Sequence, residues 1–141
     1  MVDIQAILYD GSYHDVDSSD AAFQRAAGIA LRKAVMMAGP ALLEPIMEVD
    51  IVIPEEFTGA VSGDLNARRG RTMGMEVKGK MQVMKANVPL AEMFTYANDL
   101  RSMTQGTGSY TMKFSHYENV PGKIAQPIIT HYQEHHKEEE E

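Results

Sequence analysis

The chain has 141 residues, 44% of them hydrophobic, and its 20 acidic and 13 basic side chains give a formal net charge of −7. No apolar run reaches the roughly 18 residues that a membrane-spanning helix needs, and no signal-peptide pattern follows Met1. The absence of cysteine excludes a disulfide scaffold, a cysteine-based zinc site and thiol catalysis. We therefore expect one or two small domains with a packed core, in the cytoplasm.

The negative charge is unevenly distributed along the chain. The stretch from Glu134 to Glu141 contains five glutamates and one lysine, whereas the stretch from Asp64 to Lys85 contains six basic residues and two acidic ones. Binding partners must therefore be inferred from local patches of charge, because the net charge mainly affects solubility and long-range steering.

The first 40 residues predict a short strand, a polar loop and a helix. Residues 4–9 are rich in Ile and Leu and end at the turn pair Asp10-Gly11, which favours a strand. Ser18 or Ser19 is expected to cap the helix, and Gly39-Pro40 to end it. One strand and one helix cannot enclose a core, so we expect this segment to be part of a larger domain.

Residues 44–117 predict the complete order strand, helix, strand, strand, helix, strand. This order is typical of an α+β, ferredoxin-like split βαβ sandwich, with two helices on one face of an antiparallel sheet. The predicted strands cover residues 47–53, 72–77, 81–88 and 109–115, and the helices are indicated by Phe57, Val61 and Leu65 and by Leu90, Met93, Phe94, Ala97 and Leu100.

Several local features carry expectations of their own. Gly59 and Gly63 weaken the first of these helices, so we expect a close approach of the backbone there. Gly70 is expected to adopt a left-handed conformation after the helix. Irregular alternation near Val83-Met84 predicts a bulge or burial on both faces. Pro127 is expected to place the terminal helix mainly after it, or to kink that helix.

Several strings resemble the C-terminal part of bacterial translation elongation factor G. They are GSYHDVDSS at 11–19, LEPIM at 43–47, GDLNARRG at 63–70, VPLAEMF at 88–94, LRS at 100–102 and TQG at 104–106. The resemblance implies that residues 1–40 are the C-terminal part of the family's fourth domain, a strand–helix remnant of a ribosomal protein S5 domain 2-like fold. It further implies that residues 41–119 are the ferredoxin-like fifth domain and residues 120–141 a terminal helix and acidic tail.

The resemblance also implies a role in moving tRNA and mRNA through the ribosome. The family's proteins are GTPases, but the phosphate-binding string G-x-x-x-x-G-K-[ST] does not occur here. We therefore expect no enzymatic activity in this chain, with GTP and Mg²⁺ bound by an upstream domain of a longer parent. Met1 is then the start of a fragment, or of a short natural paralogue.

Two groups of residues are the candidate ribosome contacts that the resemblance implies. The loop at the tip of the fourth domain, which approaches tRNA at the decoding site, corresponds to Gly11, Ser12, Tyr13, His14, Asp15 and Asp17. Cations of the fifth domain that face large-subunit rRNA are expected among Arg68, Arg69, Arg71, Lys78, Lys80 and Arg101.

Each candidate also has a purely structural interpretation. His14-Asp15 can be an ordinary polar turn, and Arg68-Arg69 can simply complement a helix dipole. Arg101 can be an ion-pair partner of Asp64 or Glu92. His131 and His135 have the spacing of metal ligands on a helix, but a solvated tail is the better interpretation, and we expect no metal.

Other functions fit the same pattern. The chain can be a freestanding ferredoxin-like module that binds RNA or a small ligand, or part of a ribosome-protection factor. Residues 4–9 and the helix after them, without the rest of their domain, are expected to pack on the fifth domain, to pair with a second copy of the chain, or to fray, and we favour pairing.

Overall fold

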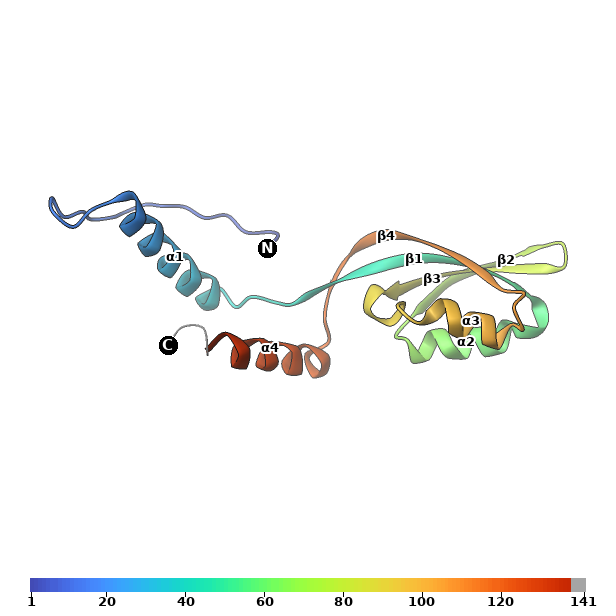
Figure 1. The fold of residues 1–141 in the computed structure, drawn as a ribbon. Coiled ribbons are helices and arrows are strands. Elements are labelled where there is room, and N and C mark those ends of the chain that lie inside the picture. Colours follow the sequence, from blue (N-terminus) through green and yellow to red (C-terminus); the bar gives the residue numbers. More distant parts are fainter. Residues whose placement is uncertain (138–141) are drawn as a thin grey trace. The chain divides into compact units, whose positions relative to one another are not determined.

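The computed structural model describes residues 1–137 and divides into two compact units, Met1–Ala41 and Leu42–Glu141. Figure 1 shows the elements of both units along the chain. The acidic residues 138–141 of the predicted tail lie outside the described part. No helix among the described residues is long and apolar enough to cross a membrane.

The first unit contains one helix, α1 (Asp20–Met37). The Ser19 hydroxyl accepts a hydrogen bond from the Ala22 N–H at 3.2 Å, and Asp20 lies in the first turn where its charge favours the positive end of the helix dipole. The helix ends before Gly39, whose φ is +68°. The predicted cap and stop of this helix are therefore confirmed.

The predicted strand at residues 4–9 is wrong. This segment belongs to no sheet within residues 1–137, and all of residues 1–41 except Val35 are exposed. A strand needs a neighbour to satisfy its backbone N–H and C=O groups, and the first unit offers none. Pairing of this segment with a second copy stays a prediction, which light scattering can test.

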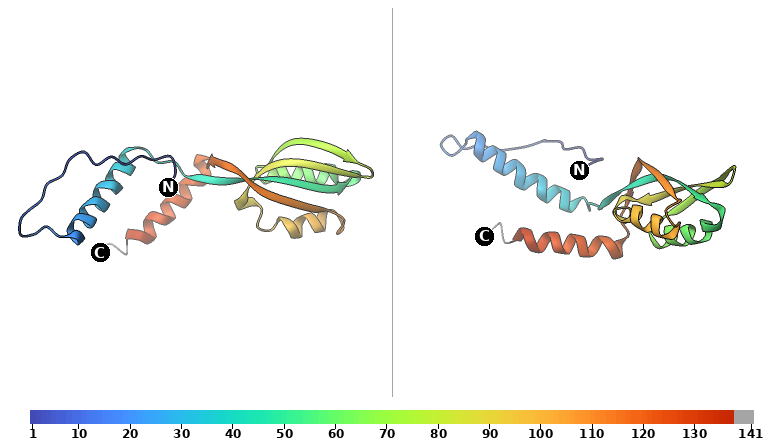
Figure 2. Two further views of the ribbon diagram at one scale, coloured as in Figure 1. Left: turned by 90° about the horizontal axis from the view of Figure 1, so that it is seen from above. Right: turned by 45° about the vertical axis from the view of Figure 1, so that its right-hand side comes forward.

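The second unit has a four-stranded antiparallel sheet. Its strands are β1 (Leu43–Pro54), β2 (Arg71–Lys78), β3 (Met81–Pro89) and β4 (Ser109–Asn119), in the spatial order β2-β3-β1-β4. Helices α2 (Thr58–Ala67) and α3 (Tyr96–Met103) cover one face (Figures 1 and 2). This arrangement confirms the ferredoxin-like sandwich.

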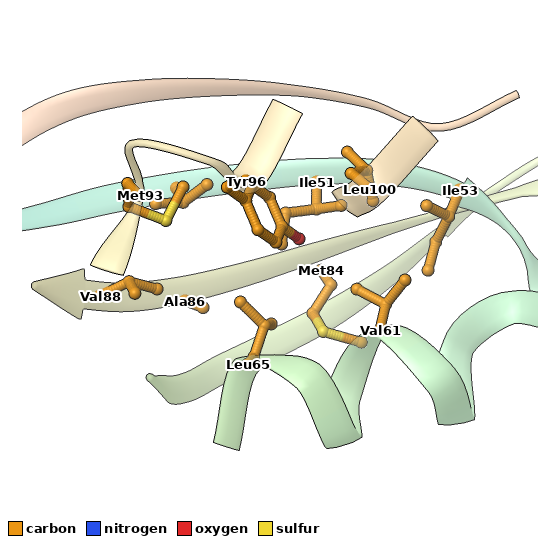
Figure 3. Packing of buried hydrophobic residues seen from close by; sticks show 11 residues of the cluster. Ile51, Ile53, Val61, Leu65, Met84, Ala86, Val88, Met93, Tyr96 and Leu100 are labelled. Carbon is orange, nitrogen blue, oxygen red and sulfur yellow. The ribbon is translucent and has the colours of Figure 1, made fainter. Parts of the chain in front are cut away.

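The core lies between that face and the two helices. Figure 3 shows Val61 and Leu65 of α2 and Tyr96 and Leu100 of α3 packing over the strands. Val83 and Met84 are 6% and 1% exposed, so the predicted burial on both faces of β3 is confirmed. The shifts in register occur elsewhere, at Thr72/Gly74 and at Ile46/Met47.

The second predicted helix is right about Met93 and Leu100, which are 3% and 2% exposed, and wrong about Phe94 and Ala97, which are exposed. A 3₁₀ turn covers Leu90–Glu92, and α3 begins only at Tyr96. Phe94 is consequently 80% exposed, whereas Tyr96 is completely buried. The break between the 3₁₀ turn and α3 changes which residues face the sheet. A single helical period over residues 90–100 therefore placed Phe94 and Ala97 on the buried side, where neither lies.

The terminal helix α4 (Gly122–Lys137) begins ahead of Pro127. The N–H groups of Ile124 and Ala125 both donate to the Pro121 carbonyl, at 2.8 and 2.9 Å. These bonds establish a first turn ahead of Pro127, and residues 128–137, the larger part of the helix, follow it, as expected.

Two expectations about glycines in and after α2 are also wrong. A Cβ at Gly59 or Gly63 would meet nothing within 4 Å, so neither allows a close approach. The left-handed residue after the helix is Arg69, with φ +59°. A Cβ at Gly70 would lie 2.8 Å from the Leu65 carbonyl oxygen, and this close contact explains the glycine.

Replacement of Gly70 and of Gly63 by alanine is expected to change the free energy of unfolding in opposite directions. Gly70→Ala forces the backbone apart and should lower the free energy of unfolding by about 1–3 kcal/mol. Gly63→Ala should raise it by about 0.5–1 kcal/mol, because alanine is the better helix former in open space. Urea unfolding of both variants measures the difference. A Gly70→Ala protein as stable as the parent would contradict the packing at this turn.

Candidate functional site

The loop before α1 is fixed to the start of that helix by two reciprocal hydrogen bonds. The His14 N–H donates to Ser18 Oγ at 2.7 Å, and the Ser18 N–H donates to the His14 carbonyl at 3.1 Å. The predicted loop residues Gly11, Ser12, Tyr13, Asp15 and Asp17 are all exposed. The structure thus presents them together on a short turn that is tied to a helix.

The His14 ring accepts a hydrogen bond through Nδ1. The Val16 N–H lies 3.3 Å from Nδ1, and Asp17 Oδ2 lies 3.5 Å from the same atom. A ring whose Nδ1 accepts a hydrogen bond carries its proton on Nε2. The side chain therefore offers an N–H donor at an exposed position, and Tyr13 beside it offers an exposed ring, which suits hydrogen bonding and stacking with RNA.

Arg68 connects the end of α2 to α3. Its guanidinium donates to Asp64 at 2.7 Å, to the Glu92 carbonyl at 2.7 Å and to Asp99 at 2.5 Å. It also lies 5.1 Å from the centre of the Tyr96 ring. The bond from Arg68 to Asp99, together with one from the Thr95 hydroxyl, holds the pKa of Asp99 below its ordinary value.

Arg69 connects the same turn to the start of β1. It donates to both carboxylate oxygens of Glu44, at 2.6 and 2.9 Å, and to Glu92 at 3.1 Å. The side chains of Arg68 and Arg69 are only 14% and 25% exposed. Both cations are thus engaged by carboxylates of this chain, which supports their structural interpretation.

Arg101 does not have the predicted partner. Asp64 pairs with Arg68, and Glu92 pairs with Arg69. The expected pairing of Arg101 with either carboxylate is wrong, because two arginines nearer in space take both positions. Arg101 is exposed on α3.

Apart from Arg101 on α3, the remaining cations lie on or beside an exposed hairpin. Strand β2 is exposed along its whole length, and Lys78 and Lys80 flank its turn at Gly79, where φ is +63°. Arg71 is 74% exposed and lies 3.5 Å from Glu118. Lys78, Lys80 and Arg101 therefore present their charges to solvent, and a phosphate backbone could approach them.

The uncovered face of the sheet carries charges that sequence reasoning missed. Strand register places Lys113 opposite Glu48 and Lys85 opposite Gly74, next to Glu76 on the same face of β2. The charged atoms of Lys113 and Glu48 lie 3.2 Å apart, and those of Lys85 and Glu76 lie 3.3 Å apart. Asp50 lies between these pairs, with Oδ1 buried and without a hydrogen-bond partner among the described residues. Such pairs depend on register, which the sequence did not reveal.

Burial of Tyr96 predicts a loss of stability at high pH. Burial, together with the nearby charge of Asp64, raises the pKa of Tyr96. As pH rises, the unfolded chain loses this phenolic proton before the folded chain does. The contribution of neutral Tyr96 to the free energy of unfolding is therefore fully present below about pH 10 and is lost as pH rises further. Between pH 9 and 11 the melting temperature should fall less for Tyr96→Phe than for the parent. The control Tyr9→Phe, at a side chain that is 94% exposed, should behave as the parent does, and equal falls in all three proteins would be contrary to this expectation.

Comparison with known families agrees with the division of the chain into two units. The family model described as elongation factor G C-terminus matches residues 41–128, and the model described as elongation factor G, domain IV matches residues 1–39. Both matches concern a translation factor of protein biosynthesis. The chain belongs to the elongation factor G family.

A solved structure supports the same relationship. The crystal structure of the protein ttk003000868 from Thermus thermophilus is 49% identical in sequence, with a TM-score of 0.77 over 89% of this chain. The match covers 19% of that protein, so the present chain spans about a fifth of its length. Among the described residues, no group of three or more His, Asp or Glu side chains could hold a metal ion.

Proposed function

We propose that this chain is the ribosome-contacting C-terminal part of a translational GTPase that promotes movement of tRNA and mRNA. The observation that carries the proposal is the match to elongation factor G families over residues 1–39 and 41–128. In this proposal, residues 1–40 belong to domain IV, residues 41–119 form domain V, and residues 120–141 form the terminal segment of a cytoplasmic protein.

The two surfaces have different partners in this proposal. The loop from Gly11 to Asp17 contacts the tRNA–mRNA duplex through hydrogen bonds and stacking. Lys78, Lys80 and Arg101 contact phosphates of large-subunit rRNA. These assignments are supported by the exposure of both groups in the described part of the chain.

This chain contributes binding rather than chemistry. Its residues do not fit GTP and Mg²⁺, because no spaced glycines and lysine are available to hold the phosphates. Nucleotide binding is therefore assigned to another part of the longer protein. The standalone RNA-binding alternative is less well supported, because the register places no aromatic side chain on the central strands of the open sheet face, where stacking on RNA bases would require one.

Co-sedimentation of the 141-residue chain with ribosomes at several salt concentrations tests this proposal. We expect salt-dependent binding, and Lys78→Gln and Lys80→Gln should each reduce the logarithmic salt slope by up to about 1. Lys113→Gln is the matched control, because this lysine is paired with Glu48 on the other edge strand. Binding that is absent at low salt, or equal in all four proteins, would contradict the proposal.

A further inference from the structure

Strands β1 and β4 continue past the end of the four-stranded sheet (Figure 1). Strand β1 pairs with β3 only from Ile46 onward, but it pairs with β4 from Leu43. Residues 43–45 and 117–119 therefore form a two-stranded extension, here called the neck. The Val120 N–H closes it by donating to the Leu42 carbonyl at 2.9 Å. A ribbon of two strands is marginally stable without support.

Two glutamates face each other across this neck. Glu44 of β1 is the register partner of Glu118 of β4. Directly opposed like charges destabilise an antiparallel pair, and Glu44 is only 9% exposed. A nearly buried carboxylate requires a cation or hydrogen-bond donors close by.

The segment Arg69-Gly70-Arg71 supplies a cation to each glutamate. Arg69 binds both oxygens of Glu44, at 2.6 and 2.9 Å. Arg71 lies 3.5 Å from Glu118, which also contacts His116 at 2.8 Å. Arg69 in turn contacts Glu92 after β3, so one short segment connects both neck strands to the body of the domain.

The backbone of this segment forms a helix-ending turn that has arginine at its left-handed position. The Gly70 N–H donates to the Leu65 carbonyl at 2.7 Å and the Arg69 N–H to the Asn66 carbonyl at 3.2 Å, the pattern of a Schellman motif. The left-handed position of this motif is usually glycine, yet Arg69 occupies it with φ +59°. An arginine in an unfavourable conformation that glycine would adopt freely indicates a use for its side chain.

We propose that Arg69 and Arg71 form a clamp that holds the neck rigid against the four-stranded sheet. The chain passes through the neck at Leu42 towards residues 1–41 and at Val120 towards α4. Arg69 and Arg71 are thus positioning residues, which pass a displacement of the ferredoxin-like domain on to the neck. Their role in translocation rests on the proposed function, whereas their effect on the neck does not.

Hydrogen exchange of the 141-residue chain, followed by NMR, tests the clamp. Arg69→Gly removes the side chain but keeps the left-handed turn, so the domain should fold. We expect exchange of the Val120 amide, relative to the Ile51 amide of the core, to rise about tenfold as charge-assisted bonds to Glu44 are lost. Arg71→Gln should raise it by about twofold to threefold, because that pair is more exposed.

Further variants separate a clamp from general stabilisation. Glu44→Gln should raise the ratio of the Val120 exchange rate to the Ile51 exchange rate, as Arg69→Gly does. The double variant should raise this ratio no further than either single variant, because both substitutions remove the same interaction. Lys113→Gln, on the same strand pair but in the four-stranded part, should leave the ratio unchanged. A ratio within twofold of the parent in Arg69→Gly, equal acceleration of both amides, or multiplicative effects in the double variant would overturn the proposal.

A functional readout uses Glu44→Gln in a full-length elongation factor G that carries this region. Ribosome binding should stay within about twofold of the parent while translocation slows severalfold, since contact surfaces are intact but the neck is loose. Unchanged translocation would overturn the clamp's mechanical role. If instead the parent 141-residue chain fails to bind ribosomes, the proposed function fails, and the exchange measurements still decide whether the clamp exists.

Discussion

Replacement of Arg68 by methionine is expected to lower the free energy of unfolding of the second unit by about 2–4 kcal/mol. The side chain is 14% exposed and donates to Asp64, Asp99 and the Glu92 carbonyl. Methionine preserves much of the apolar packing but leaves all three acceptors without this donor. It also removes the cation from the Tyr96 ring.

Denaturant unfolding of the second unit measures this loss. The matched control is Lys113→Met, because Lys113 is 72% exposed and pairs with Glu48 at 3.2 Å. An exposed pair of this kind is expected to contribute no more than about 1 kcal/mol. Equal losses in the two variants would contradict the central place of Arg68 in the packing of α2 against α3.

Replacement of His14 by alanine in a full-length elongation factor G carrying this region is expected to slow translocation by roughly fivefold to tenfold. The residue offers an exposed Nε2–H donor on a loop that is tied to α1. Ribosome-stimulated GTP hydrolysis should stay within about twofold, because this loop has no part in nucleotide binding. Rapid kinetics of both steps on the same preparation give the comparison.

Two further variants identify which atom of His14 matters. Asparagine can accept the Val16 N–H in place of Nδ1, whereas glutamine can present a donor near the position of Nε2. If Nε2–H contacts RNA, His14→Gln should recover more activity than His14→Asn. Equal losses of translocation and GTP hydrolysis in His14→Ala would contradict the proposed division between binding and chemistry.

The sequence predicted the fold well because its signals were local and strong. Alternation from Met47 to Ile53, ended by Pro54, predicted most of β1. The gap between the predicted strands 72–77 and 81–88 contains Gly79, whose φ of +63° fits the turn between β2 and β3. The helical spacing of Val61 and Leu65 likewise identified the buried side of α2. Each signal depends on neighbours in the chain, which a sequence displays directly.

Features that depend on distant contacts were predicted poorly. Residues 4–9 have strand composition but no partner strand within residues 1–137, so composition alone misled. Phe94, which was expected to be buried, is exposed because a 3₁₀ turn interrupts the helix, and Tyr96 is buried instead. Arg69 takes the left-handed position expected of Gly70 because its side chain reaches Glu44, 25 residues away in sequence. The functional roles of the loop and hairpin residues stay predictions.

Site-directed probing of ribosomal RNA tests the account most directly. The chain has no cysteine, so Ser12→Cys and Val77→Cys each give one attachment point for a tethered iron reagent. Val77 is 74% exposed on the hairpin, and Ser12 lies in the exposed loop. We expect cleavage of small-subunit RNA at the decoding region from Ser12→Cys and of large-subunit RNA from Val77→Cys. Cleavage at the same sites from both positions, or none above that of the free reagent, would contradict the account.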